Sequence, residues 1–221
     1  MTNFYEQYPR FFVSVDCIIF GYTEGSIKLL IHKRPYNPGK GEMSLIGGFV
    51  RSGENLDDAA SRVLMEFTGL RQKVQQMETF GDVNRDPGER VISLVYYSLI
   101  NVKQFDSDCA MHEAEWVDLN NMPNLCFDHN QMVFKAIKKV RERIFTEPLV
   151  ANLLQPLFTL TQLQMVYEAI LGHPIDKRNF RRTIADHDFF EKTEFVDKSG
   201  SRRGAALYKQ KVFSPQHGEG K

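Results

Sequence analysis

The first two thirds of the chain alternate short apolar runs with polar turns, a pattern typical of a sheet. Phe11 to Phe20 is rich in β-branched and aromatic residues, and Ile27 to His32 follows after a turn. Both runs predict buried strands. Met43 to Val50 predicts another strand, in which the Gly47-Gly48 pair requires a bend or a close approach of the backbone. Shorter strands are predicted at Thr79 to Asp82, Val91 to Val102 and Glu115 to Val117.

Two segments of the same region have helical periodicity instead. Apolar residues recur at helical spacing along residues 59–67, and Gly69 suits the left-handed conformation that ends a helix. His129 to Phe145 carries its apolar residues on one side, as an amphipathic helix does. The mixed order of strands and helices predicts an α+β domain over residues 10–145.

A different pattern follows a proline-bounded connector at residues 146–156. Thr161 and Gln164 predict a capping box at the start of one amphipathic helix, and Asp176 can cap a second helix whose first turn is basic. Two alternating segments, Thr193 to Asp197 and Ala205 to Val212, then predict a hairpin. This order is the sequence form of a winged helix-turn-helix. We therefore expect two domains, residues 1–147 and 148–221.

Cations cluster on the second of these helices and at the tip of the hairpin. A solvated helix or a solvated loop would explain either cluster alone, but both together in this order favour binding to duplex DNA. Asn179 and Arg178 are the expected base readers, because Asn pairs with adenine and Arg with guanine. The others are expected to contact phosphates. The candidate DNA-binding residues are Lys177, Arg178, Asn179, Arg181, Arg182, Lys198, Arg202 and Arg203.

Composition adds little about function, but it bears on the charge of the chain, its cysteine chemistry and its cellular compartment. The chain has 28 Lys+Arg and 28 Asp+Glu, so only local clusters carry a charge argument, and three widely spaced cysteines match no disulfide framework or zinc site. No signal peptide or membrane-length apolar run is recognised, which predicts a soluble, cytoplasmic protein with no membrane partner. Because one winged helix reads few base pairs, we expect a homodimer on a palindromic double-stranded operator.

A more specific pattern runs from Gly48 to Leu70. Gly48 is followed after five residues by Glu54 and after seven more by Arg62. The spacing resembles the Nudix box, G-x5-E-x7-R-E-U-x-E-E-x-G-U, in which U is aliphatic. Seven of its nine specified positions are kept, and the two exceptions are Val63 and Phe67, where the family has glutamates. The resemblance implies a Nudix fold.

The two exceptions bear on catalysis. Positions 63, 66 and 67 are neighbours on a helix, and in active Nudix enzymes their carboxylates hold magnesium or manganese. Here only Glu66 remains, and Mg²⁺ requires several oxygen ligands in octahedral order. We therefore expect no hydrolase activity, no catalytic residues, no metal site and no cofactor. Two alternatives stay open: an active hydrolase that uses Arg62, Glu54 and Glu66, and a module that only binds proteins.

Over roughly residues 10–213 the chain resembles the Nudix-related transcriptional regulators, in which a Nudix-like domain serves as an effector sensor before a winged helix. That family includes regulators that sense ADP-ribose and branches found beside sugar-catabolic genes. The altered box resembles the sugar-responsive branch, such as the arabinose regulators, so we expect a sugar such as L-arabinose, with ADP-ribose as the alternative. The residues that carry the resemblance are Phe158 to Gln164, Tyr167, Glu168, Ile170, Asn179 to Arg182, Phe80 to Asp82, Arg85-Asp86, Arg90 to Ser93 and Phe127 to His129.

Polar residues on predicted loops and strand ends are candidates for the effector site. A sugar requires acid and amide groups for its hydroxyls and an aromatic face, whereas ADP-ribose requires arginines for its diphosphate. Two of the candidates have simple alternative roles, since Glu115 could lie on the surface and His129 could cap the following helix. The candidate effector-binding residues are Arg34, Glu42, Arg85, Glu115 and His129.

Overall fold

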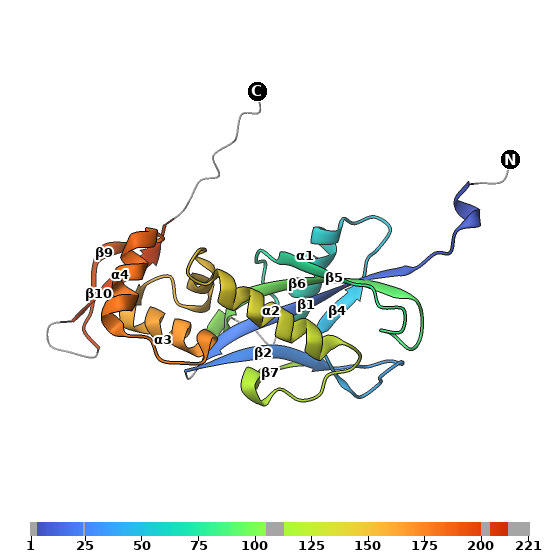
Figure 1. Ribbon diagram of the computed structural model, residues 1–221, viewed down its shortest axis with the longest axis horizontal. Helices are drawn as coiled ribbons and strands as arrows, with labels where there is room; N and C mark the ends of the chain where they lie inside the picture. The colour runs from blue at the N-terminus through green and yellow to red at the C-terminus, as the bar shows by residue number, and fades with distance from the viewer. Residues whose placement is uncertain (1–3, 24, 105–112, 200–203, 212–221) are drawn as a thin grey trace, which may run out of the picture. The chain divides into compact units, whose positions relative to one another are not determined.

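The computed structural model describes residues 4–23, 25–104, 113–199 and 204–211, which belong to two compact units, Met1–Lys139 and Val140–Lys221 (Figure 1). Each unit contains its own sheet. The expected fold class is confirmed: an α+β domain with a mixed sheet is followed by a winged helix-turn-helix.

The first unit is built on β1 (Phe12–Thr23), which lies inside a seven-stranded mixed sheet. β1 pairs in parallel with β6 along eleven residues and antiparallel with β2 and β4, and β2 also pairs with β7. The remaining elements before α2 are η1 (Phe4–Gln7), β2 (Ser26–Lys33), β3 (Met43–Ser44), β4 (Ile46–Phe49), α1 (Leu56–Thr68), β5 (Gln75–Phe80), β6 (Val91–Asn101), η2 (Val102–Gln104), β7 (Ala114–Asp118) and η3 (Leu119–Asn121).

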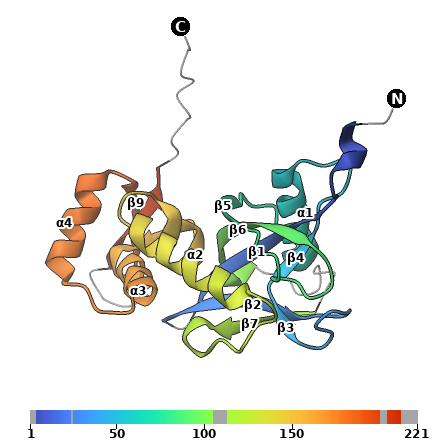
Figure 2. The same cartoon turned by 45° about the vertical axis from the view of Figure 1, so that its right-hand side comes forward.

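The two faces of β1 have different surroundings, since side chains alternate along a strand. Helix α1 packs against β1 and β4 (Figure 2). Val15, Cys17 and Ile19 of β1 are fully buried in an apolar cluster that they form with residues of this helix. Asp16 points to the other face together with Ser93 of β6. A charged residue therefore sits within a strand whose neighbouring positions are all buried.

The helix of the Nudix-like pattern ends where the sequence predicts. The Asp58 carboxylate accepts hydrogen bonds from the backbone and side-chain amides of Asn55, which precedes α1. Gly69 has φ of 70° and donates its N–H to the carbonyl of Met65. Only glycine adopts this left-handed conformation without cost, so α1 stops there.

The second unit begins within the long helix α2 (His129–Arg143) and contains the winged helix. Phe180 and Ile184 bury one side of its basic helix against α3, and Tyr167 packs edge-on against Phe180. The elements after α2 are η4 (Leu149–Leu153), β8 (Phe158–Thr159), α3 (Leu160–Leu171), α4 (Lys177–His187), β9 (Phe190–Asp197) and β10 (Ala205–Gln210).

One local prediction in this unit is wrong. The capping box of α3 is formed by Thr159 and Gln162, two residues earlier than the expected pair of Thr161 and Gln164. Both pairs fit the same spacing, and pairing of β8 with β10 keeps the chain extended as far as Thr159. The side chain of Gln164 instead donates to Glu168 and to the carbonyl of Ile175, at the turn between the two helices.

The connector between the two predicted domains is packed and partly helical. Its residues Leu149, Val150 and Leu153 form a 3-10 helix and are buried. The two compact units divide between Lys139 and Val140, inside α2, and not in the connector. The domain limits 1–147 and 148–221 stay a prediction.

We predict that Gly47→Ala destabilises the protein by about 1–3 kcal/mol, the usual cost of forced overpacking. A Cβ atom at Gly47 would clash with Asp16 Oδ1 and lie 2.9 Å from the carbonyl oxygen of Val15. The matched control is Gly53→Ala, where a Cβ would have no neighbour within 4 Å. Urea unfolding measures both free energies, and equal values for the two variants would contradict the close approach at Gly47.

Candidate functional site

The first unit contains a hollow on the face of the sheet to which Asp16 points. The hollow has a cavity volume of about 60 Å³, and about 520 Å³ of space lies between its atoms when open solvent is included. It is lined by the ends of β1, β2 and β4 and by the loops that carry Arg85 and Phe127. Polar and aromatic side chains from distant parts of the sequence therefore meet in one place.

A buried ionic cluster forms one wall of the hollow. Arg85 makes two hydrogen bonds to Asp128, of 3.0 and 2.9 Å, and lies 3.5 Å from Asp16 Oδ2. The hydroxyl of Ser93 donates to the same Oδ2 at 2.5 Å. The Arg85 side chain is only 3 % exposed, so its charge is compensated by these carboxylates rather than by water.

His129 adds a neutral imidazole to this wall. Its Nδ1 accepts a hydrogen bond from the backbone N–H of Leu45 at 3.2 Å, so the ring proton is on Nε2. Nε2 lies 3.8 Å from Asp16 Oδ1. Burial lowers the pKa of His129, although the negative charge of Asp16 acts in the opposite direction. The imidazole is therefore a neutral hydrogen-bond donor at pH 7.

Arg34 lies elsewhere on the rim of the hollow, held by two aromatic rings. Its guanidinium carbon is 5.0 Å from the ring centroid of Tyr36 and 5.0 Å from that of Phe127. Its Nε donates to the carbonyl of Pro38 at 2.5 Å. Phe127 also packs edge-on against His129, with 5.6 Å between the ring centroids.

Phe127 achieves this position with a left-handed backbone, at φ of 56°. Bulky residues rarely adopt that region, and residues that do so cost about 1–3 kcal/mol each and cluster at functional sites. This backbone conformation places the ring of Phe127 in contact with both Arg34 and His129, on the wall of the hollow.

The hollow brings together three of the five candidate effector residues. Arg34, Arg85 and His129 line it, whereas Glu42 and Glu115 do not. Glu115 lies on β7, paired with Ile31 on the other side of β2, and is exposed. Asp16 and Tyr36 are not singled out by the sequence, and Ser93, Phe127 and Asp128 are named there only in segments that carry the family resemblance. A signal for Asp16 existed, because a lone carboxylate interrupts an apolar strand.

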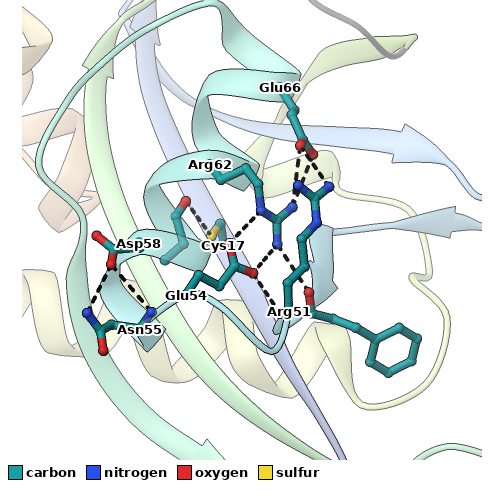
Figure 3. A network of polar contacts seen from close by, with 9 residues as sticks. Cys17, Arg51, Glu54, Asn55, Asp58, Arg62 and Glu66 are labelled. Carbon is teal, nitrogen blue, oxygen red and sulfur yellow. Dashed lines mark hydrogen bonds and ion pairs between the residues drawn. The ribbon is translucent and has the colours of Figure 1, made fainter.

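The charged residues of the Nudix-like box form a second network of hydrogen bonds and ion pairs, distinct from the cluster around Arg85 (Figure 3). Arg62 binds Glu54 through two hydrogen bonds of 2.9 and 2.7 Å and Glu66 through contacts of 3.4 and 3.3 Å. Arg51 also contacts Glu66, at 3.4 Å. The hydrogen bonds from Arg62 hold the pKa of Glu54 at about 2, well below its usual value. Both remaining carboxylates of the box are thus neutralised by arginines.

The two altered box positions face the core. Val63 is fully buried and Phe67 is 3 % exposed, and both belong to the apolar cluster beneath α1. The Phe67 ring lies edge-on to His32, which lines the hollow, with 4.8 Å between the ring centroids. Within the described ranges, no group of three His, Cys, Asp or Glu side chains could hold a metal ion.

In the second unit, the basic residues of α4 are exposed. Lys177, Arg178, Asn179, Arg181 and Arg182 all lie on the solvent side of the helix, and Lys198 directly follows β9. No ion pair is found for any of these cations within the part of the chain that the structure describes. Arg202 and Arg203, also expected to bind DNA, lie outside the described residues.

Two other cations, Lys209 of β10 and Lys211 just after it, are already neutralised. Lys209 pairs with Glu191 at 3.0 Å, and Lys211 pairs with Asp188 at 2.5 Å. Among the described residues of the winged helix, the cations that make no ion pair lie on α4, at Lys192 of β9 and at Lys198 after β9. None of the helices in the described segments is long and apolar enough to cross a membrane.

Fold and charge distribution together define a Nudix-type domain joined to a DNA-binding winged helix. Residues 10–136 match the model of the NUDIX domain, and residues 150–210 match that of the NrtR DNA-binding winged helix domain. The chain belongs to the NrtR family of Nudix-related transcriptional regulators.

Three relatives extend this comparison. The chain is 34 % identical over 209 residues to the ADPR responsive transcriptional repressor NtrR of Acinetobacter baylyi, covering 92 % of this chain and 83 % of that protein. It is 38 % identical over 130 residues to the ADP-ribose pyrophosphatase of Methanocaldococcus jannaschii, covering 58 % of this chain and 75 % of that enzyme.

The third relative is Shewanella oneidensis NrtR, known from crystal structures. Its complex with a 27mer DNA has a TM-score of 0.80 and 27 % identity, over 90 % of this chain and 93 % of that one. The cocrystal structure of its NUDIX domain with ADP ribose has a TM-score of 0.55 and 26 % identity, over 63 % of this chain and 94 % of that one. The names of these relatives mention ADP-ribose, so the expected assignment to the arabinose branch finds no support among them.

We predict that the contribution of the Glu54–Arg62 pair to stability depends on pH. The pKa of Glu54 is lowered to about 2 in the folded state, so the pair stabilises fully above the ordinary value of 4.5. This stability is lost as pH falls through about 2. The difference in unfolding free energy between the wild type and Glu54→Gln should accordingly shrink from pH 5 toward pH 2.

Urea unfolding at several pH values measures this difference. Glu89→Gln serves as the control, because Glu89 is exposed and outside the network. A difference that grows toward acid pH would show that Arg62 does not hold Glu54 in its charged form.

Proposed function

We propose that this protein is a transcriptional repressor that binds operator DNA through α4 and the hairpin and senses ADP-ribose in its Nudix-type domain. The observation that carries the proposal is the distribution of the cations that make no ion pair with any residue the structure describes. On α4 they face solvent, where they suit phosphates and base edges, and in the hollow Arg34 suits a phosphate.

ADP-ribose replaces the sugar expected from the sequence. A free pentose carries no charge, so it offers nothing for the guanidinium of Arg34 to neutralise. ADP-ribose carries a diphosphate, two riboses and an aromatic base, which match a hollow with cationic, polar and aromatic walls. The names of the relatives in Acinetobacter and Shewanella support the same ligand.

Absence of hydrolysis is part of this proposal. Val63 and Phe67 replace two metal ligands by core residues, and arginines neutralise Glu54 and Glu66. A metal ion at the box would have to compete with Arg62 and Arg51 for one carboxylate. The ADP-ribose pyrophosphatase of Methanocaldococcus jannaschii makes hydrolysis the second candidate, so it requires a direct test.

A homodimer on a palindromic operator is the expected assembly. A single recognition helix reads only a few base pairs, and two copies supply the specificity needed to find one site. ADP-ribose would weaken operator binding by favouring an arrangement of the winged helices that does not fit the half-sites. It can shift this balance only by its difference in affinity for the two states.

We predict no Mg²⁺- or Mn²⁺-dependent release of AMP from ADP-ribose above background, because the box lacks the ligands for a metal. Chromatographic detection of AMP over hours measures it. Steady turnover by the wild type that disappears in Glu66→Gln would make the protein a hydrolase. Turnover that persists in Glu66→Gln would come from a contaminant.

We predict that Arg178→Ala and Asn179→Ala each lose about 1–3 kcal/mol of affinity for the operator and relax base preference at one position. Fluorescence anisotropy with an operator selected from random duplexes measures both effects. The matched control is Lys209→Ala, which removes a cation already paired with Glu191. Equal losses in the control and in Arg178→Ala would mean that charge alone, and not α4, determines binding.

The same assay tests the effector. Saturating ADP-ribose should lower operator affinity several-fold, and L-arabinose should leave it unchanged. By thermodynamic linkage, the operator must lower the affinity for ADP-ribose by the same factor. Operator affinity that responds to L-arabinose and not to ADP-ribose would restore the sugar hypothesis.

A further inference from the structure

The turn between α3 and α4 is held by a ring of three hydrogen bonds. Oε1 of Glu168 accepts from the backbone N–H of Ile175 at 2.9 Å and from Nε2 of Gln164 at 2.9 Å. The same Nε2 donates to the carbonyl oxygen of Ile175 at 2.9 Å. Both backbone polar groups of Ile175 are therefore bound by two side chains that are four residues apart on α3.

The chemistry of the ring assigns a role to each side chain. The partners of the Gln164 amide are a carboxylate and a carbonyl oxygen, both acceptors, so its NH₂ group faces them and uses one hydrogen for each. Glu168 accepts from two donors, which suits an ionised carboxylate. Its pKa is lowered, first by the hydrogen bond from the N–H of Ile175 and then by that from Gln164. The ring therefore contains a charged acceptor at pH 7.

The position of Glu168 is unfavourable for α3 taken alone. It lies in the last turn of this helix, where the helix dipole disfavours a negative charge. The helix end does not need the side chain, because the backbone carbonyl of Glu168 already accepts from the N–H of Gly172, the left-handed cap. The carboxylate therefore acts on the segment that follows the helix.

That segment leads directly into the basic helix. Ile175 precedes Asp176, whose side chain accepts from the backbone N–H of Asn179 at 2.8 Å and caps α4. The first turn of α4 carries Arg178 and Asn179, the candidate base readers. Displacement of the peptide of Ile175 would therefore displace the residues that are expected to meet the bases.

Apolar packing does not supply this precision by itself. Phe180 and Ile184 bury one side of α4. Burial is non-directional, so it selects the inner face of the helix, whereas hydrogen bonds fix both a distance and an angle. A binding group has to be held within about 0.5 Å of its productive position. The hydrogen bonds to Ile175 add this directional restraint at the end of α4 that reads DNA.

We propose that Glu168 is a positioning residue for sequence reading, although it lies on α3 and not on the basic helix. Through the peptide of Ile175 it holds the first turn of α4 in the orientation that bidentate hydrogen bonds to base edges require. Gln164 supports the same peptide from its carbonyl side. This inference rests on the proposed function, because it assumes that α4 reads the operator in the major groove.

Fluorescence anisotropy of the full-length protein tests the proposal with the selected operator and with a random-sequence duplex of equal length. Glu168→Ala should lose about tenfold or more in operator affinity, because a charged acceptor of two hydrogen bonds is removed. Its affinity for the random duplex should not fall, because the cations that contact phosphates remain. The ratio of the two affinities therefore drops. A ratio equal to that of the wild type would overturn the proposal.

Three further variants show whether the hydrogen bonds cause this drop. Glu168→Gln keeps an Oε1 acceptor and should retain a higher ratio than Glu168→Ala, and equal ratios would overturn the proposal. Glu142→Ala removes an exposed carboxylate of α2 and is the matched control for charge. An equal drop in this control would assign the effect to net charge and overturn the proposal. If Glu168→Ala does not fold, Gln164→Ala decides, since it should lose several-fold in the same ratio.

A double-mutant cycle separates positioning from general stability. If Glu168 acts through the first turn of α4, Glu168→Ala combined with Asn179→Ala should lose little more than the larger single loss, because the two changes remove the same reading. Combination of Glu168→Ala with Lys198→Ala, a cation that follows β9, should instead multiply the two losses. Multiplied losses in both combinations would mean that Glu168 only stabilises the domain, and would reject the positioning role.

The proposed function and the role of Glu168 fail in different ways. Equal affinity of the wild type for every duplex would reject sequence reading by α4, and the role of Glu168 with it. A wild type that prefers one operator, together with Glu168→Ala that keeps the same preference, would leave the proposed function intact and reject only the role of Glu168.

Discussion

The buried guanidinium of Arg85 is the constraint on which the Nudix-type domain depends. A cation that is 3 % exposed must be compensated inside the protein, and Asp128 and Asp16 do so from two different segments. Removal of one partner from such a cluster typically costs about 3–5 kcal/mol, because the other charge remains buried. The cluster therefore fastens the loop of Arg85 to the central strand and to the start of α2.

The same cluster sets the chemistry of the hollow. Arg85 contacts Oδ2 of Asp16, and because the backbone N–H of Leu45 donates to Nδ1 of His129, the ring proton is on Nε2. Neither side chain could be oriented by its own strand or helix alone. The structural ion pair and the candidate site thus share residues, which is common where polar groups have to be both buried and oriented.

The box and the winged helix show a similar division between paired and unpaired charges. Arginines neutralise the carboxylates of the box, and acidic residues neutralise Lys209 and Lys211, while the cations of α4 keep their charge toward solvent. In the part of the chain that the structure describes, cations that make no ion pair lie on the rim of the hollow, at Arg34, and on the exposed side of α4. These are the two places where the proposed function puts anionic ligands.

Local patterns gave most of the fold. The Nudix-like spacing, the terminating Gly69, the cap at Asp176 and the basic helix after it all depend on residues close in sequence, where helix and turn chemistry acts directly. The hollow could be predicted only in part. Asp16, Arg85 and Asp128 meet across more than forty residues of sequence separation at each step, and nothing local indicates that meeting.

The errors have the same origin. Thr161 and Gln164 satisfied the capping pattern as well as Thr159 and Gln162, and only the strand pairing of β8 selects between them. Glu115 looked accessible at a strand end, but its strand lies on the far side of β2 from the hollow. The choice of a sugar over ADP-ribose was an analogy to a branch of the family, and no residue pattern carried it.

The left-handed backbone of Phe127 has a consequence for the evolution and engineering of this protein. Glycine or asparagine would adopt φ of 56° more easily, so selection for thermal stability alone would favour losing the phenylalanine. Under the proposed function, the strained backbone at Phe127 is the cost of placing an aromatic ring in the effector site. Selection of this protein for heat resistance alone is therefore expected to replace residue 127 and so remove the aromatic ring between Arg34 and His129.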